Sequence, residues 1–189
     1  MEKRTIAPAG QVKLVVITGP ECTGKSTLSQ QLATHYNTIF VPEYARHFIE
    51  NLCRPYTYED VLHIAEVQRS QAHELVVKAK GVLFLDTYLI ITKVWFDVVF
   101  GRHPSWIDEE LSRNIISLYL LCDTSIPWQA DPVRENGGTM RQKLYLMYKD
   151  ELDKLGCSYS VISGLGQQRL NLATKAVDQL LKGLSGNEK

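Results

Sequence analysis

Short apolar runs along the chain alternate with longer stretches in which apolar residues recur every three or four positions. The first run, Lys13–Thr18, is nearly continuous and rich in β-branched residues, which is typical of a strand buried on both faces. Comparable runs at residues 38–41, Val82–Asp86, 117–122 and 159–163 predict four further strands. The pattern therefore predicts five short strands separated by helical stretches.

The stretches between these strands carry the helical period. Residues 58–80 place Val61, Ala65 and Ala72 at helical spacing, and Pro55 separates them from the preceding helix. Strands that alternate with helices predict an α/β domain with a five-stranded, mainly parallel sheet and helices on both faces. The expected helices cover residues 25–36, 43–52, 58–80, 88–100 and 109–116, followed by an amphipathic helix through Leu170, Ala173, Val177, Leu180 and Leu184.

The length of the chain favours a single domain. Its 189 residues fall within the roughly 100–200 residues that one domain typically holds. We expect residues 1–11 to form a flexible leader, because they contain Pro8 and Gly10 and show no hydrophobic period. Residues 12–185 are then one folded domain, and residues 186–189 a tail.

Composition and charge exclude several classes of protein. The 21 Lys and Arg residues balance the 21 Asp and Glu residues, so no basic field favours indiscriminate nucleic-acid binding. The apolar stretch 82–100 contains Asp86, Lys93 and Asp97, which are costly in a bilayer. The N-terminus lacks the apolar core of a secretory signal. We therefore expect a cytoplasmic protein without a nucleic-acid or membrane partner, and a homo-oligomer remains an open alternative.

Cysteine and histidine spacing offers no metal site. The four cysteines are too far apart for Cys-x-x-Cys chemistry, and a reducing compartment favours free thiols. The five histidines show no ligand spacing either. We expect neither a disulfide nor a zinc site at these residues, which are Cys22, Cys53, Cys122, Cys157, His35, His47, His63, His73 and His103.

Residues 19–26 match the phosphate-loop motif Gly-x-x-x-x-Gly-Lys-Ser, directly after a β-branched strand and before a helix. Such a loop points backbone N–H groups at phosphate oxygens, while Lys25 reaches the β- and γ-phosphates and Ser26 ligates Mg²⁺. The motif predicts a P-loop NTPase fold with ATP and Mg²⁺ as cofactors, against the alternative of a Gly-rich turn. The expected nucleotide contacts are Gly19, Pro20, Glu21, Cys22, Thr23, Gly24, Lys25, Ser26 and Thr27.

Two further features of this region each allow two interpretations. Asp86 ends an apolar strand, as the Mg²⁺-linked carboxylate of a Walker B strand does. In an open parallel sheet it would meet the phosphate loop at the carboxyl ends of the strands, although it could instead cap the following helix. Cys22 is either a small loop filler or a thiol activated by the helix N-terminus.

Three residues point to transfer of phosphate to a small molecule. Glu43 lies just beyond the second strand, where a phosphate acceptor would sit. Arg134 and Arg141 flank Gly-Gly in residues 129–141, which we interpret as a closing lid. Arginines there could neutralise charge on the transferring phosphoryl group. Glu43 could instead be a carboxylate that only stabilises the N-terminus of the following helix. Both arginines could instead be solvated charges of a surface loop.

Four segments together resemble one particular family. They are Gly-Pro-Glu-Cys-Thr-Gly-Lys-Ser-Thr-Leu, Val-Pro-Glu-Tyr-Ala-Arg, the Leu-Asp86-Thr87 strand end, and Tyr119 to Arg134 with its Pro-Trp128 step. The chain is thereby similar to the ribosylnicotinamide kinase domain of NadR-type proteins, from about Val12 to Arg141. The resemblance implies an ATP:nicotinamide riboside 5′-phosphotransferase with a nucleoside-kinase-like fold, acting in NAD salvage. The adenylyltransferase and DNA-binding activities of NadR-type proteins are expected to be absent.

The resemblance also suggests roles for individual residues. A nicotinamide ring needs an aromatic platform, for which Tyr44, Tyr88, Trp95 and Trp128 are candidates, each of them also suited to core packing. We assign Arg46 to substrate binding as well. The loop 163–166 resembles the position at which such kinases hold adenine.

The roles of the two carboxylates and the reaction itself leave alternatives. We assign Glu43 to the acceptor hydroxyl and Asp86 to the metal, and the reverse assignment stays open because both strand ends face one crevice. A kinase of another nucleoside or nucleotide is the closest alternative function. A P-loop ATPase switch without a small-molecule acceptor is the alternative from a different class.

Overall fold

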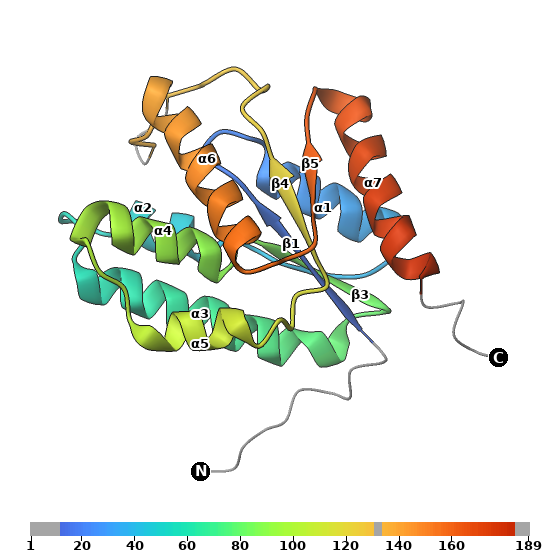
Figure 1. Ribbon diagram of the computed structural model, residues 1–189, viewed down its shortest axis with the longest axis horizontal. Coiled ribbons are helices and arrows are strands. Elements are labelled where there is room, and N and C mark those ends of the chain that lie inside the picture. Colours follow the sequence, from blue (N-terminus) through green and yellow to red (C-terminus); the bar gives the residue numbers. More distant parts are fainter. Residues whose placement is uncertain (1–11, 131–133, 184–189) are drawn as a thin grey trace, which may run out of the picture.

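The computed structural model describes residues 12–130 and 134–183, and they form a parallel five-stranded sheet (Figure 1). The strand order is β2-β3-β1-β4-β5, and every pair of neighbouring strands is parallel. The predicted α/β class with a five-stranded, mainly parallel sheet is therefore confirmed. The strands are β1 (Lys13–Thr18), β2 (Phe40–Val41), β3 (Val82–Asp86), β4 (Leu118–Cys122) and β5 (Tyr159–Ile162).

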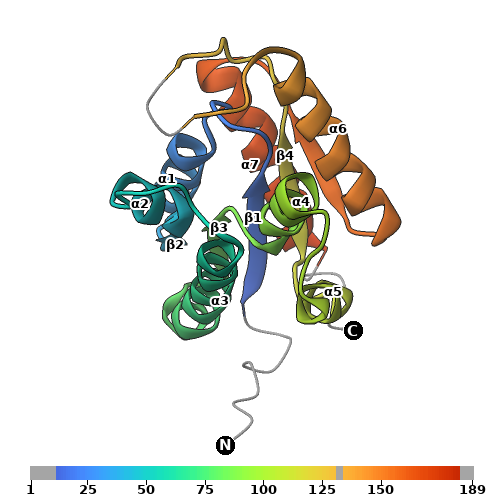
Figure 2. The same cartoon turned by 90° about the vertical axis from the view of Figure 1, so that its left-hand side faces the viewer.

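Helices cover both faces of the sheet, and the alternation of side chains along the strands decides which face each residue joins. On β1, Val15 and Ile17 pack with α1 (Lys25–His35) and α7 (Gly166–Lys182). Leu14 and Val16 face the opposite side. The helices on that side are α3 (Tyr58–Leu75), α4 (Leu89–Phe100), α5 (Ser105–Ser112) and α6 (Gly138–Lys154), as the two views in Figures 1 and 2 show. The short helices are α2 (Tyr44–Glu50) and the 3-10 turn η1 (Val76–Lys78).

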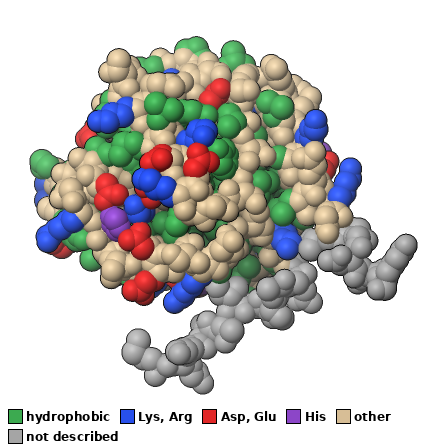
Figure 3. Space-filling view, in the orientation of Figure 1, with side chains coloured by type: hydrophobic (Ala, Val, Ile, Leu, Met, Phe, Trp, Pro, Cys, Tyr) green, Lys and Arg blue, Asp and Glu red, His purple; other side chains and the backbone are tan. Residues whose placement is uncertain are grey.

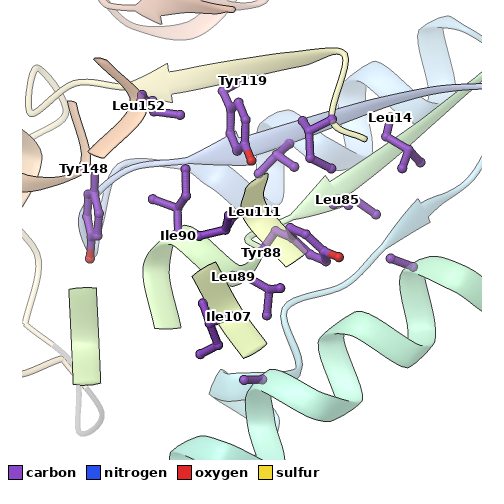
Figure 4. Close-up of a cluster of buried hydrophobic side chains, with 14 of the residues drawn as sticks. Leu14, Leu85, Tyr88, Leu89, Ile90, Ile107, Leu111, Tyr119, Tyr148 and Leu152 are labelled. Atoms are coloured by element: carbon purple, nitrogen blue, oxygen red, sulfur yellow. The ribbon is translucent and has the colours of Figure 1, made fainter. Parts of the chain in front are cut away.

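The larger hydrophobic core lies between the sheet and these four helices (Figure 4). Leu85 of β3 and Tyr119 of β4 pack there with Leu89 and Ile107, which are both fully buried. Each fully buried side chain of this size contributes about 1.5–3 kcal/mol. The core therefore fixes α4 against the carboxyl end of β3, beside the phosphate loop.

The sheet brings the two strand ends with the motif residues together. β1 lies between β3 and β4, and Ile17 is the register partner of Asp86. From β1 the chain crosses through α1 to β2 at one edge of the sheet, and from β3 it crosses to β4 on the other side of β1. The ends of β1 and β3 therefore lie at the topological switch point, where open α/β sheets bind ligands. The phosphate loop after β1 and the carboxylate at the end of β3 meet at this point.

Helix prediction was wrong in two places. The helix expected at 109–116 is α5 at Ser105–Ser112, because Pro104 stands at its N-cap and because Ile107 and Leu111 supply its buried face. Helix α6 was not predicted, since Gly137 and Gly138 suggested a loop. Its buried residues Leu144, Tyr148 and Leu152 recur every four positions, which is the signal that could have revealed it.

Smaller differences concern the ends of elements. Helix α3 ends at Leu75, five residues earlier than expected, and η1 follows it. Strand β2 holds two residues where four were expected. The predicted leader 1–11, the tail 186–189 and Leu184 lie outside the described residues, as do residues 131–133 of the predicted lid.

The surface matches the balanced charge of the sequence. In Figure 3 acidic and basic side chains are interspersed on the face shown, without a large area of one sign. No helix of the described chain has the length and apolar character needed to cross a bilayer.

Candidate active site

The phosphate loop joins β1 to α1 and needs glycine at two positions. Gly19 has φ 136°, and a Cβ added there would lie 2.5 Å from the carbonyl oxygen of Cys122 on β4. Gly24 is the N-cap of α1 in the left-handed region, and a Cβ there would lie 2.8 Å from Cδ1 of Ile126. A side chain at Gly19 would therefore push the loop away from the backbone of β4, whereas Gly24 is needed chiefly for its left-handed conformation, with φ 69°.

Donors outside and within the loop bind its carbonyl oxygens. Arg141 donates from Nε to Glu21 O at 3.0 Å and from Nη2 to Cys22 O at 2.7 Å. Arg169 of α7 donates to Thr23 O, and the Lys25 ammonium donates to Pro20 O at 2.9 Å. Because these donors occupy the loop carbonyls, we expect the N–H groups of the loop to bind phosphate, as an anion-binding nest does.

The position of Arg141 differs from the expected mobile lid. It lies in the first turn of α6, is 6% exposed, and stacks at 5.8 Å over the ring of Trp128. The alternative of a solvated loop charge is therefore wrong for Arg141. Its guanidinium supports the phosphate loop.

Replacing Arg141 with alanine should lower the free energy of unfolding by about 1–3 kcal/mol, because two loop carbonyls lose their charged donor. Denaturant unfolding followed by circular dichroism measures this effect. Lys143→Ala changes an exposed residue of the same helix and should leave stability unchanged. Wild-type stability in Arg141→Ala would contradict the supporting role.

A cavity of about 480 Å³ opens in front of the loop, within the range typical of small-molecule sites. The phosphate loop forms one wall, and residues of α2, α3, α4 and α6, together with residues 134–136, form most of the rest of the lining. Most of the predicted site residues share this cavity. They are Gly19, Glu21, Cys22, Thr23, Gly24, Lys25, Ser26, Thr27, Glu43, Arg46 and Arg134.

Asp86 lies directly beside the loop and is 2% exposed. Burial raises the pKa of its carboxyl, and a hydrogen bond from Ser26 and the charge of Lys25 act in the opposite direction. Its Oδ1 has no hydrogen-bond partner among the described residues. A hydroxyl beside an unsatisfied carboxylate oxygen fits Mg²⁺, which takes oxygen ligands and keeps several waters.

Glu43 stands directly before α2, but its side chain does not cap that helix. It is the N-cap residue, yet its side chain makes no capping hydrogen bond within the described structure. The carboxylate instead lines the cavity. Enclosure by the cavity walls raises the pKa of Glu43, although the nearby charge of Lys25 lowers it. A carboxyl with a raised pKa beside the phosphate lysine suits a proton acceptor.

The segment before α6 lies against the phosphate loop. Asn136 donates from its backbone N and from Nδ2 to the two carboxylate oxygens of Glu21, at 3.1 and 2.9 Å. Arg134 lines the cavity and donates to Gln129 O at 2.6 Å. Cys22 accepts from the backbone N of Gln129 at 3.3 Å and donates to Pro127 O at 3.5 Å. These contacts give Cys22 a packing role and bring Arg134 to the phosphate side of the cavity.

One of the four candidate aromatic residues reaches the cavity. Trp95 of α4 lines it. Tyr44 instead bonds His63 at 3.1 Å, Tyr88 is buried in the core, and Trp128 packs against Gly137. The expectation that Tyr44, Tyr88 or Trp128 faces the substrate therefore lacks support from the cavity lining.

Sequence reasoning missed several residues of the cavity wall, among them Tyr56, Gln68, Thr87 and Tyr148. Thr87 has φ 72°, a conformation that costs a β-branched residue energy and that clusters at functional sites. Its hydroxyl accepts from Nε2 of the buried Gln68 at 2.9 Å. The position of Thr87 directly after Asp86 was the available sequence signal.

The loop expected to hold adenine follows β5 and precedes α7. None of residues 163–166 is among the described residues that line the cavity. Arg169, which follows this loop, donates to Ile162 O at 3.2 Å as well as to the phosphate loop. The adenine assignment stays a prediction.

A family profile described as an AAA domain matches residues 14–169. The trifunctional NAD biosynthesis/regulator protein NadR of Salmonella typhimurium is 28% identical over 141 residues, and that of Escherichia coli is 29% identical over 136 residues. These alignments cover 71% and 70% of the chain. The chain spans about a third of the length of both relatives, 34% and 33%.

Solved structures show the same fold at lower identity. NadR protein in complex with NR has a TM-score of 0.69 at 22% identity, covering 90% of this chain and 52% of that one. Thymidylate kinase from Ehrlichia chaffeensis has a TM-score of 0.62 at 14% identity, covering 89% and 98%. The nucleoside- and nucleotide-kinase-like P-loop fold is therefore confirmed.

Proposed function

The chain belongs to the AAA domain family, and from this premise we propose that it is a kinase that transfers phosphate from ATP to the 5′-hydroxyl of a nucleoside. The observation that carries the proposal is the shared cavity of Lys25 and Glu43. One end offers a phosphate loop, and a carboxylate with a raised pKa stands beside it. A hydroxyl bound between them would meet both the γ-phosphate and a proton acceptor.

Each polar residue then has one task. Lys25 and the loop N–H groups bind the β- and γ-phosphates, and Glu43 orients the acceptor hydroxyl and takes its proton. Ser26 and Asp86 would hold Mg²⁺, which neutralises charge on the phosphates when bound. Arg134 adds positive charge near the transferring group, and Arg46 contributes to the acceptor side.

The acceptor that we propose is nicotinamide riboside, converted to its mononucleotide in NAD salvage in the cytoplasm. Similarity to NadR proteins, one of them solved in complex with NR, supports this choice. Trp95 and Tyr56 line the cavity and offer aromatic surface for a flat base. We propose that residues 12–185 carry this activity as one domain.

Replacing Asp86 with asparagine should raise the Mg²⁺ concentration needed for half-maximal rate, because the metal loses a charged partner. High Mg²⁺ should restore part of the rate. The measurement is initial rate against Mg²⁺ concentration for Asp86→Asn and Glu43→Gln side by side. Metal rescue of Glu43→Gln, without rescue of Asp86→Asn, would reverse the two roles.

A panel of acceptors tests the proposed reaction. ATP consumption is measured without acceptor and with nicotinamide riboside, pyrimidine nucleosides and nucleoside monophosphates. The proposal expects nicotinamide riboside to give the highest kcat/KM. A higher kcat/KM for another nucleoside or nucleotide would support a kinase with a different substrate. Equal rates of ATP consumption with and without an acceptor would favour an ATPase switch.

A further inference from the structure

Glu21 places a carboxylate inside the phosphate loop. It lines the cavity, where the negative charge of its side chain would repel a bound phosphate. One residue occupies both of its carboxylate oxygens, since Asn136 donates to Oε2 from its backbone N at 3.1 Å and to Oε1 from Nδ2 at 2.9 Å. The side chain of Glu21 therefore binds the segment before α6, whereas the loop backbone serves phosphate.

The two hydrogen bonds fix the position of Asn136. Hydrogen bonds to an ionised acceptor are roughly twice as strong as neutral ones, and a pair of them adds geometric specificity. Residues 134–136 belong to no helix or strand, so side-chain contacts rather than a backbone ladder hold them in place. The Glu21 carboxylate is thus an anchor for this short segment.

Arg134 is the cationic residue that the anchored segment carries. It stands two residues before Asn136, so the Cα atoms of the two lie within about 7 Å of each other. Its guanidinium donates to Gln129 O at 2.6 Å, and the backbone N of Gln129 donates to Cys22 Sγ at 3.3 Å. Two adjacent loop residues, Glu21 and Cys22, therefore connect to Arg134, one through its backbone and one through its side chain.

The carboxylate of Glu21 can be studied apart from its backbone. Arg141 donates to the carbonyl oxygen of Glu21 and supports the fold of the loop. Asn136 binds only the carboxylate among the polar groups of Glu21. Substitution of the Glu21 or Asn136 side chain therefore leaves the contacts of Arg141 with the loop in place.

We propose that Glu21 is a positioning residue for phosphoryl transfer, whose carboxylate holds Asn136 and thereby keeps Arg134 beside the transferring phosphoryl group. This role rests on the proposed kinase function. A charged group that is in place before the reaction stabilises developing charge without reorganisation. Loss of the contact should therefore lower kcat and leave the KM for Mg·ATP nearly unchanged, because the loop and Lys25 still bind the phosphates.

An exchange of the hydrogen-bonding partners tests the contact. Asn136→Asp places two carboxylates against each other and should lower kcat about tenfold, a size found for residues in one hydrogen-bond network. Adding Glu21→Gln should return kcat to within about threefold of the wild type. The glutamine amide can donate to the new aspartate, and its oxygen can accept the backbone N–H of residue 136. The assay uses saturating Mg·ATP with nicotinamide riboside, or with the best nucleoside of the acceptor panel.

A double-mutant cycle shows whether the effect passes through Arg134. Arg134→Ala should lower kcat by itself, and Asn136→Asp should then cause no further loss, because the group that it displaces is absent. Glu21→Ala removes the acceptor without introducing repulsion and should show the same dependence on Arg134. Asn171→Asp adds the same charge at an exposed position of α7 outside the cavity wall and should keep the wild-type kcat.

The outcomes separate this role from the kinase proposal. Wild-type kcat in folded Asn136→Asp and Glu21→Ala overturns the positioning role, as does an equal loss with and without Arg134. Failure of Glu21→Gln to rescue Asn136→Asp also overturns it. Phosphorylation of a nucleoside by the wild type establishes the kinase in each of these cases. If the wild type phosphorylates no nucleoside, the proposed function fails and the positioning role falls with it.

Discussion

Replacing Lys25 with alanine is expected to reduce phosphoryl transfer by at least about 10³-fold while the protein stays folded. The Lys25 ammonium contacts the loop at Pro20 O and lines the cavity, without packing in either hydrophobic core. Its charge is needed where negative charge develops on the β- and γ-phosphates. The loss should appear in kcat, measured with saturating Mg·ATP and nucleoside.

A matched control separates the loss of this charge from a general effect of removing lysine. Lys182→Ala removes an exposed lysine near the end of α7 and should keep the wild-type kcat. Circular dichroism and thermal unfolding establish that both variants are folded. A folded Lys25→Ala variant with unchanged kcat would refute the catalytic role of the loop.

Replacing Glu43 with glutamine is expected to lower kcat by roughly 10²–10⁴-fold, the usual contribution of a general base. The amide keeps the shape of the side chain but cannot accept the proton of the acceptor hydroxyl. Affinity for Mg·ATP should stay within about twofold of the wild type, because phosphate binding depends on the loop. Steady-state kinetics with each substrate varied in turn checks both statements.

The pH profile gives an independent test of the same residue. A general base must be ionised, and the pKa of Glu43 is raised above its ordinary value of 4.5, chiefly by burial. The wild-type kcat/KM should therefore decrease as the pH falls through that raised pKa, and the residual rate of Glu43→Gln should lack this decrease. Glu66→Gln, which changes an exposed carboxylate of α3, should keep the wild-type profile. Persistence of the acid limb in Glu43→Gln would assign the base to another group.

The fold could be predicted from the sequence wherever burial imposes a clear pattern of apolar residues. Strands β1 and β3 match their predicted bounds, because a strand covered on both faces must be apolar throughout. Helix α6 was missed because its start carries Gly137 and Gly138. Its apolar face of Leu144, Tyr148 and Leu152 is spread over 17 residues with low mean hydropathy. Tertiary packing against α4, more than local propensity, explains that helix.

The parts of the site that belong to contiguous sequence motifs could be predicted from the sequence. The loop residues and Glu43 line one cavity as expected. Trp95 and Tyr56 are 39 positions apart in sequence and meet only through the packing of α4 near the start of α3. No local pattern distinguishes Trp95 from the core residues around it. The buried position of Tyr88 likewise depends on the turn that Thr87 makes after β3.

Arg141 shows that residue type alone does not predict whether a charged side chain is exposed or buried. A lysine or arginine near a glycine pair suggests a mobile charge, yet this guanidinium is buried against two carbonyl oxygens of the phosphate loop. The carbonyl oxygens of Glu21 and Cys22 need donors once they are shielded from water, and Arg141 supplies them. That requirement follows from the backbone geometry of residues 20–23, which sequence does not display.

The central claim, transfer of phosphate from ATP to a nucleoside, is tested most directly by identifying the product. The protein is incubated with Mg·ATP and nicotinamide riboside, and the phosphorus is followed by ³¹P NMR. We predict a new phosphomonoester resonance, coupled to the 5′ protons of the riboside, that grows in step with ADP. Release of inorganic phosphate at the same rate with and without the nucleoside, and no phosphomonoester, would contradict the account.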